Sequence, residues 1–278
     1  MRRATLVWLL GSSVCANFAC SRSRVEPNDS LAFMIGSQTV ASLRLEELTR
    51  RIEPRTVTVF EPYEQAPAAF EAISLAAVLD EAYGPSWRDH EALLFTCRDG
   101  YQPTIPVKRV LQHQAFVAFA RPGEDGFTIL KDEEGTKRRV PLEPAYVIWN
   151  NLDDDRILAE GDYGWPYQVT QIGLVSFRSR FAEMVPPEDA SAKVRAGFEA
   201  FSAHCSKCHA VNGHGGTVGP ELNYPANPTE YMKADWLRRW IDDPTSMRQS
   251  PRMPPLNAKL PRRAELIEEI VAYLEAMA

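Results

Sequence analysis

The residues with the clearest chemical potential lie in the stretch AHCSKCHAVNGHGG, residues 203–216. Cys205 and Cys208 are separated by two residues, and His209 directly follows the second cysteine. A Cys-x-x-Cys pair can act as a redox dithiol, as half of a structural zinc site or, when histidine follows, as the attachment point of a covalent haem. The surrounding sequence has to distinguish these three chemistries.

The sequence context argues against the first two. A thioredoxin-type dithiol begins a helix after a strand, whereas this motif follows a predicted helix and precedes a glycine-rich loop. Structural zinc usually needs four ligands, but no cysteine follows Cys208, and His214 is the only histidine beyond His209. Haem attachment would use the whole motif: Cys205 and Cys208 would form two thioethers, and His209 would bind the iron as the proximal ligand.

The elements around the motif are predicted to be helical. Apolar residues recur at helical spacing in three segments, KVRAGFEAFSAHC, YMKADWLRRWIDD and AELIEEIVAYLEAM. Strand signals vanish after the polar, proline-containing linker at residues 183–192. We therefore expect an all-α domain over residues 193–278.

Upstream of the linker the pattern is mixed. Short apolar runs predict strands at residues 55–60, 92–97, 115–120, 127–130 and 145–150. Helical periodicity predicts helices over residues 72–83 and 107–114. Residues 39–182 are thus expected to form an α+β domain, preceded by a flexible lead-in at residues 21–38.

Composition and the N-terminus narrow the class of protein. The 278-residue chain carries a formal net charge of −6, so it lacks a chain-wide basic surface for nucleic acid. Residues 1–20 have two arginines before a short apolar run that ends in small residues, which is typical of a secretory signal. Small residues before Cys20 suggest a lipoprotein site, although Asn17 stands where a leucine-like residue is usual; cleavage after Ala16 is the alternative. We expect a periplasmic protein, with a membrane tether if Cys20 is lipidated.

Residues 193–278 resemble the class I cytochrome c family. In GFEAFSAHCSKCH, Gly197 and Phe201 precede the motif at the spacings used by that family. The resemblance implies that the first helix crosses closely at Gly197 against an aromatic residue of the last helix, for which Tyr273 is the candidate.

The same resemblance implies how the iron is held. In GPEL, Pro220 would pack on His209, and its backbone carbonyl would accept the Nδ1 proton. In SPRMPPLN, Met253 would be the sixth ligand, whose thioether raises the reduction potential. Met247 is the competing ligand, and His214 is expected to be a loop residue because it is too close to His209 in sequence.

Residues 40–180 resemble the molybdopterin-binding domain of the sulfite oxidase family, through RDGY (98–101) and the later YGWPYQVTQIGLVSF. In that family a cysteine in a Cys-x-Gly-Asn setting binds molybdenum, but here the corresponding stretch VTVFEPYEQAP has no cysteine. Cys97 lies elsewhere, in a predicted strand, and is expected to be buried and inert. The alternatives are molybdenum ligation by Cys97 and a reactive or partner-bridging thiol. We expect this domain to lack molybdopterin.

The remaining polar residues of this domain give weaker signals. The run LDDDR (152–156) could hold a cation through its carboxylates, although a solvated acidic loop is the simpler expectation. His90 and His113 are expected at the surface.

Three functions follow from these patterns. The first is an exported carrier with one haem c, which exchanges single electrons with redox proteins. The second is a sulfite dehydrogenase-like molybdopterin enzyme with the haem as a relay, so whether the chain is an enzyme stays open. The third is a haem sensor, which would need an open sixth position on the iron.

Overall fold

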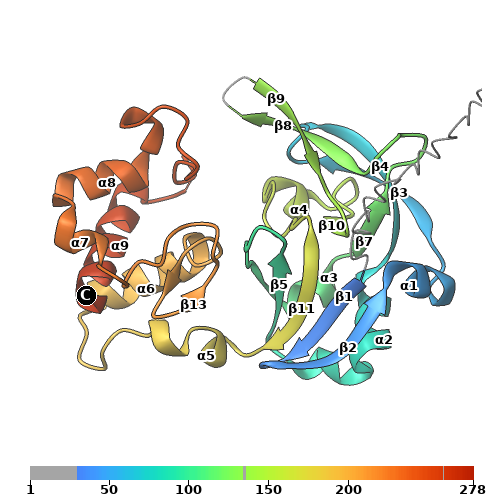
Figure 1. Ribbon diagram of the computed structural model, residues 1–278, viewed down its shortest axis with the longest axis horizontal. Helices are drawn as coiled ribbons and strands as arrows, with labels where there is room; N and C mark the ends of the chain where they lie inside the picture. The colour runs from blue at the N-terminus through green and yellow to red at the C-terminus, as the bar shows by residue number, and fades with distance from the viewer. Residues whose placement is uncertain (1–29, 134–135, 259) are drawn as a thin grey trace, which may run out of the picture.

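The computed structural model describes residues 30–133, 136–258 and 260–278. Figure 1 shows a mixed α+β N-terminal region, from β1 to β11, beside a helical C-terminal region. The two are joined through the short helix α5 (Phe177–Arg180). The predicted signal sequence and Cys20 lie outside the described residues. Within the described ranges, no helix has the length and apolar character needed to cross a membrane.

One sheet of the N-terminal region has the strand order β2-β1-β11-β5-β6. Strands β1 and β11 are parallel, and the other neighbours are antiparallel. The strands are β1 (Ser30–Ile35), β2 (Gln38–Arg44), β5 (Ala92–Cys97), β6 (Thr104–Pro106) and β11 (Val169–Val175). Cys97 at the end of β5 pairs with Val169, so the loop that follows β5 leaves the sheet at this end.

A second, antiparallel sheet has the order β10-β7-β4-β3. Its strands are β3 (Arg55–Glu61), β4 (Ala66–Ser74), β7 (Ala115–Ala120) and β10 (Tyr146–Trp149). Strands β8 (Thr128–Glu133) and β9 (Thr136–Pro141) form a separate hairpin. Short helices connect the strands: α1 (Leu45–Arg51), α2 (Leu75–Tyr83), the 3-10 helix η1 (Pro85–Asp89), α3 (Val107–Gln112) and α4 (Asp155–Ala159).

The two sheets and helix α2 share one hydrophobic core. Phe33 and Phe95 come from the first sheet, Phe70 and Val117 from the second, and Leu79 from α2; all five are essentially inaccessible to solvent. Burial of such side chains stabilises a fold by about 1.5–3 kcal/mol each. The apolar runs that predicted β5 and β7 belong to this core, and these two strands have the predicted bounds.

The secondary structure differs from expectation in two segments of this region. Residues 30–38 are not a flexible lead-in, because Leu31 and Phe33 of β1 point into the core in strand alternation. The helix predicted over residues 72–83 begins later, at Leu75, where the Ser74 hydroxyl accepts a hydrogen bond from the Ala77 amide. Residues before it belong to β4, since pairing with β3 and β7 outweighs the helical preference of its alanines.

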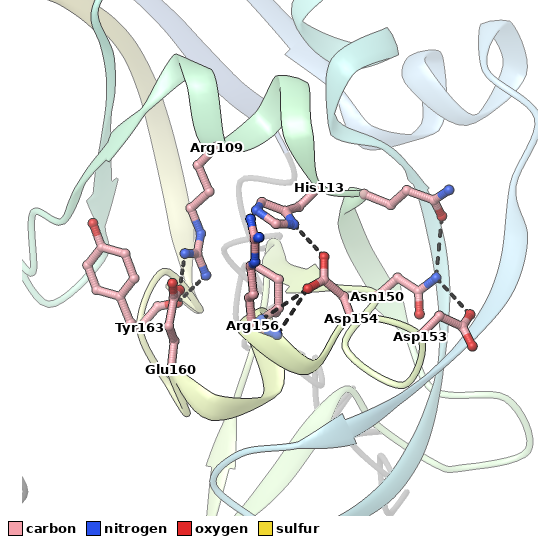
Figure 2. Close-up of polar contacts among 10 residues, drawn as sticks. Arg109, His113, Asn150, Asp153, Asp154, Arg156, Glu160 and Tyr163 are labelled. Atoms are coloured by element: carbon pink, nitrogen blue, oxygen red, sulfur yellow. Dashed lines mark hydrogen bonds and ion pairs between the residues drawn. The ribbon is translucent and has the colours of Figure 1, made fainter.

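A polar network fixes α3 against the segment around α4 (Figure 2). Arg109 is buried; it pairs with Glu160 and donates to the backbone oxygen of Tyr163 at 3.3 Å. Its guanidinium also lies 4.5 Å from the centroid of the Trp149 ring. The Glu160 carboxylate and the Trp149 ring together stabilise the buried Arg109 guanidinium.

The acidic run at residues 152–156 takes part in the same network. Asp154 caps α4 by accepting from the Arg156 and Ile157 amides, and it contacts His113 (Figure 2). His113 is thus half-buried and paired rather than a free surface residue. Among the described residues, no group of three or more His, Cys, Asp and Glu side chains is arranged to hold a metal ion.

The C-terminal region is built from helices, as predicted. They are α6 (Ala192–His204), α7 (Pro228–Tyr231), α8 (Ala234–Asp242), the 3-10 helix η3 (Pro244–Ser246) and α9 (Arg263–Met277). Two two-residue strands, β12 (Ala210–Val211) and β13 (His214–Gly215), follow the cysteine motif. A second hydrophobic core joins α6, α8 and α9.

The packed part of this region begins before the predicted linker at residues 183–192. Phe181 and Met184 are buried in the C-terminal core, Met184 within the 3-10 helix η2 (Ala182–Met184). The Tyr273 hydroxyl donates to the Met184 backbone oxygen at 2.8 Å. The first part of the connection is therefore held against the helices by apolar burial.

Candidate functional site

The crossing of α6 and α9 carries the cysteine motif. At Gly197 a side-chain Cβ would lie only 1.9 Å from the Glu269 backbone oxygen, so the two helices approach closely because glycine has no side chain. The Tyr273 ring packs beside this crossing, with its centroid 5.2 Å from that of Phe201. The close crossing at Gly197 and the aromatic partner Tyr273 are both present as expected.

The end of α6 folds the motif into a tight turn. Cys205 caps the helix, and its amide donates to the Phe201 oxygen at 2.8 Å. The amides of Cys208 and His209 then both donate to the Cys205 oxygen, at 3.0 and 2.9 Å. The main-chain bonds thus bring both cysteines and the histidine into one turn.

The imidazole of His209 is oriented by a backbone carbonyl. Its Nδ1 lies 2.8 Å from the Pro220 oxygen, an acceptor that requires Nδ1 to carry the proton. Burial lowers the pKa of His209, which favours the neutral ring. Neutral imidazole protonated on Nδ1 has its lone pair on Nε2, which is the atom that can bind a metal.

Position 219, in the loop directly before Pro220, has space only for a residue without a side chain. A Cβ at Gly219 would lie 2.3 Å from Cε1 of His209, and the Gly219 amide donates to the Cys208 oxygen at 2.8 Å. This loop therefore lies directly against the imidazole. A hollow beside it is lined by Ala210 and three glycines together with Thr217, Glu221 and Tyr224.

The two cysteines of the motif are not paired in a disulfide. Burial raises the pKa of Cys205 to about 12 and also raises that of Cys208, so both stay protonated at neutral pH. Such thiols are poor nucleophiles for disulfide exchange, which depends on the thiolate. The donor set of two thiols and one oriented imidazole nitrogen fits a covalently attached haem.

The candidates for a second axial ligand lie in irregular or short elements. Met253 is half-buried between η3 and α9, in a segment held to α8 by the Leu256 amide, which donates to the Ile241 oxygen at 3.3 Å. Met247 is half-buried at the end of η3, and His214 lies in β13. Which side chain completes the coordination stays a prediction.

Sequence reasoning missed one part of the site. The Arg98–Gln102 loop after β5 forms main-chain hydrogen bonds with the motif loop, described below. The sequence RDGY by itself indicates only a resemblance to another family. Backbone contacts between distant segments leave no residue pattern that could have revealed this role.

Comparison with protein-family models matches residues 194–278 to cytochrome c. The matched range includes α6, the cysteine motif, Pro220, Met253 and α9, and it does not extend into the N-terminal region. No curated protein matched the chain.

Proposed function

Because residues 194–278 form a cytochrome c domain, which binds haem c and transfers electrons, we propose a specific function for the chain. It is an exported c-type cytochrome with one covalent haem, whose iron is held by His209 and Met253. It passes single electrons between redox proteins.

The observation that carries this proposal is the turn from Cys205 to His209. It brings together two cysteine side chains and an imidazole whose Nδ1 faces the Pro220 carbonyl at 2.8 Å. Cys205 and Cys208 would hold the porphyrin through two thioethers, each of which would arise from addition of one S–H to one vinyl group, with the hydrogen retained on the neighbouring carbon. No oxidant or reductant is consumed. When bound, the haem supplies one-electron chemistry at iron.

The protein's own groups then set the properties of the site. The Pro220 carbonyl fixes the orientation of His209 and increases the basicity of its Nε2. Met253 would supply a thioether, which raises the reduction potential and closes the iron to other ligands. The two prolines that follow Met253 restrict the backbone of this loop.

The N-terminal pattern and the charge balance of the chain support proposals about its location and its partners. The N-terminal pattern supports a periplasmic location, with a lipid tether if Cys20 is modified. Partners are then redox proteins of the same compartment, and the acidic balance of the chain gives no reason to expect nucleic acid.

The N-terminal region is proposed to serve without molybdopterin. Cys97 is buried within β5, and burial strongly raises its pKa, which opposes the thiolate that metal ligation needs. These properties support an inert thiol over a molybdenum ligand, and so a docking role for this region over a molybdopterin oxidoreductase with a haem relay.

The axial assignment is tested by carbon monoxide binding to the reduced protein. Met253→Ala should open the iron, so that carbon monoxide binds rapidly and the reduction potential falls. Met247→Ala is the matched control and should behave like the wild type. The assignment is wrong if the Met247 variant binds carbon monoxide and the Met253 variant does not.

A further inference from the structure

Two main-chain hydrogen bonds join the N-terminal region to the haem-attachment loop. The Gln102 amide donates to the Lys207 oxygen at 2.8 Å, and the Thr217 amide donates to the Gly100 oxygen at 3.0 Å. Lys207 immediately precedes Cys208, while Thr217 follows β13. The Arg98–Gln102 loop thus contacts the attachment loop at two points, and Figure 1 shows the end of β5 facing the β13 side of the helical region.

Hydrogen bonds within the Arg98–Gln102 loop fix its conformation. The Cys97 amide donates to the Tyr101 oxygen, and the Gly100 amide to the Cys97 oxygen, at 2.9 and 3.0 Å. The Asp99 carboxylate accepts from the Tyr101 amide at 2.9 Å. Gly100 has φ +90°, and a Cβ there would lie 2.1 Å from Thr217 Oγ1. The approach is as close as the lack of a side chain permits.

The hydrogen bond from Gln102 places the loop next to Cys208, because its acceptor Lys207 is the residue before that cysteine. Tyr101, the neighbour of Gln102 in the loop, is half-buried. The main chain of the Arg98–Gln102 loop therefore lies against the segment that carries Cys208.

A second set of contacts holds the connection between the regions. The Glu183 oxygen accepts from the Asn212 side-chain amide at 2.9 Å, and Phe181 and Met184 are buried in the C-terminal core. The chain is thus anchored on the C-terminal region shortly after α5. Because this anchor already limits the movement of the two regions relative to each other, the two hydrogen bonds at the attachment loop do not have to hold them together alone.

We propose that the Arg98–Gln102 loop is an intramolecular cap over the haem edge bonded to Cys208. The proposal rests on the proposed function, because a thioether places a haem carbon one bond from the Cys208 sulfur. The Arg98–Gln102 loop lies against the segment that holds Cys208, so it covers this haem edge and excludes water and redox reagents from it. Redox partners exchange electrons with the haem at the part of its perimeter left uncovered, and removal of water near the site also contributes to its potential.

The test opens the cap with Gly100→Leu and compares it with Gly126→Leu. Both glycines have a positive φ, +90° and +103°, but a Cβ at Gly126 meets nothing within 4 Å. The two variants therefore share the backbone strain and differ in the clash with Thr217. Hydrogen exchange of the Gln102 and Thr217 amides reports on docking, and reduction of the full-length ferric protein by hexaammineruthenium(II) reports on access to the haem.

In the wild type both amides should be protected, and Gly100→Leu should lower this protection by roughly tenfold, as expected for the loss of about one to two hydrogen bonds. The Gly100 variant should also be reduced several-fold faster, while Gly126→Leu should match the wild type in both measurements.

Three results would overturn the cap. One is equal reduction rates in all three proteins despite lost protection. The second is a Gly126 variant that changes as much as the Gly100 variant. The third is free exchange of both amides in the wild type, a measurement that needs no variant and holds even if Gly100→Leu does not fold. Protein without covalent haem would instead refute the proposed function, while its amide exchange would still show whether the loop docks.

Discussion

Gly197→Ala should destabilise the C-terminal region through a clash with backbone atoms. The added Cβ would lie 1.9 Å from the Glu269 oxygen, 2.6 Å from the Glu269 carbonyl carbon and 2.8 Å from Tyr273 Cβ. Favourable contacts between heavy atoms need about 3.5 Å, so α6 and α9 must separate by more than about 1 Å. A backbone oxygen in a helix cannot rotate away, and the crossing itself must move.

The size of the effect is the difference between two terms. Overpacking of a core costs typically ~1–3 kcal/mol, and this clash belongs at the upper end because separation also loosens the Phe201–Tyr273 contact. Alanine has a helix preference over glycine of about 1 kcal/mol, which offsets part of the loss. The net loss should be about 2 kcal/mol, which corresponds to a fall in melting temperature of roughly 10 °C for a domain of this size.

Differential scanning calorimetry of the full chain measures this change in the transition of the C-terminal region. Ala203→Gly, at an exposed position of the same helix, is the control: it should cost about 1 kcal/mol from helix preference alone. A Gly197→Ala protein as stable as the wild type, or more stable, would refute the close crossing as the reason for glycine at this position.

Three further changes test other contacts. Arg109→Met should lower the free energy of unfolding of the N-terminal region in urea by about 1–2 kcal/mol, a moderate loss because Glu160 keeps 43% of its side chain exposed; no change would contradict a structural role for this pair. Burial raises the pKa of Glu61, so the folded state holds its proton more tightly than the unfolded state. Stability from this group is therefore greatest at low pH and is lost as pH rises from the ordinary glutamate range to the raised value. Glu61→Gln should gain stability relative to the wild type as pH rises above the ordinary glutamate range in the same assay, and a constant difference would contradict the shift. Tyr273→Phe removes the hydroxyl that donates to Met184 and should cost about 1 kcal/mol by calorimetry; an unchanged transition would mean that water replaces this bond.

The sequence predicted strands that consist of continuous apolar runs, but it did not predict β1, whose alternation is equally simple. Strands β5 and β7 have the predicted bounds because their apolar runs are buried in the core. Strand β2 was missed because most of its residues are exposed, so its sequence QTVASLR carries no apolar alternation. The last residues of β4 carry a helical pattern, and their strand conformation comes from pairing with β3 and β7, which depends on tertiary structure rather than on local preference.

Some features of the candidate site could likewise be predicted from the sequence, and others could not. Cys205, Cys208 and His209 could be predicted as a haem-attachment motif because such attachment requires fixed residue types at fixed spacing. The contact of Gly100 with Thr217 could not, because it is made by backbone groups that every residue has and joins segments far apart in the chain. The proposed role of Met253 as an iron ligand depends on the three-dimensional path of the loop before α9. Sequence spacing indicates this path but does not determine it.

Intact mass spectrometry of the denatured protein, made with cytochrome maturation machinery, tests the central claim most directly. Wild-type chain and Cys97→Ala, which removes the buried thiol of β5, should each carry the mass of one haem. The Cys205→Ala, Cys208→Ala double variant should carry none. Wild-type chain without bound porphyrin, or a double variant that retains it covalently, would contradict the account.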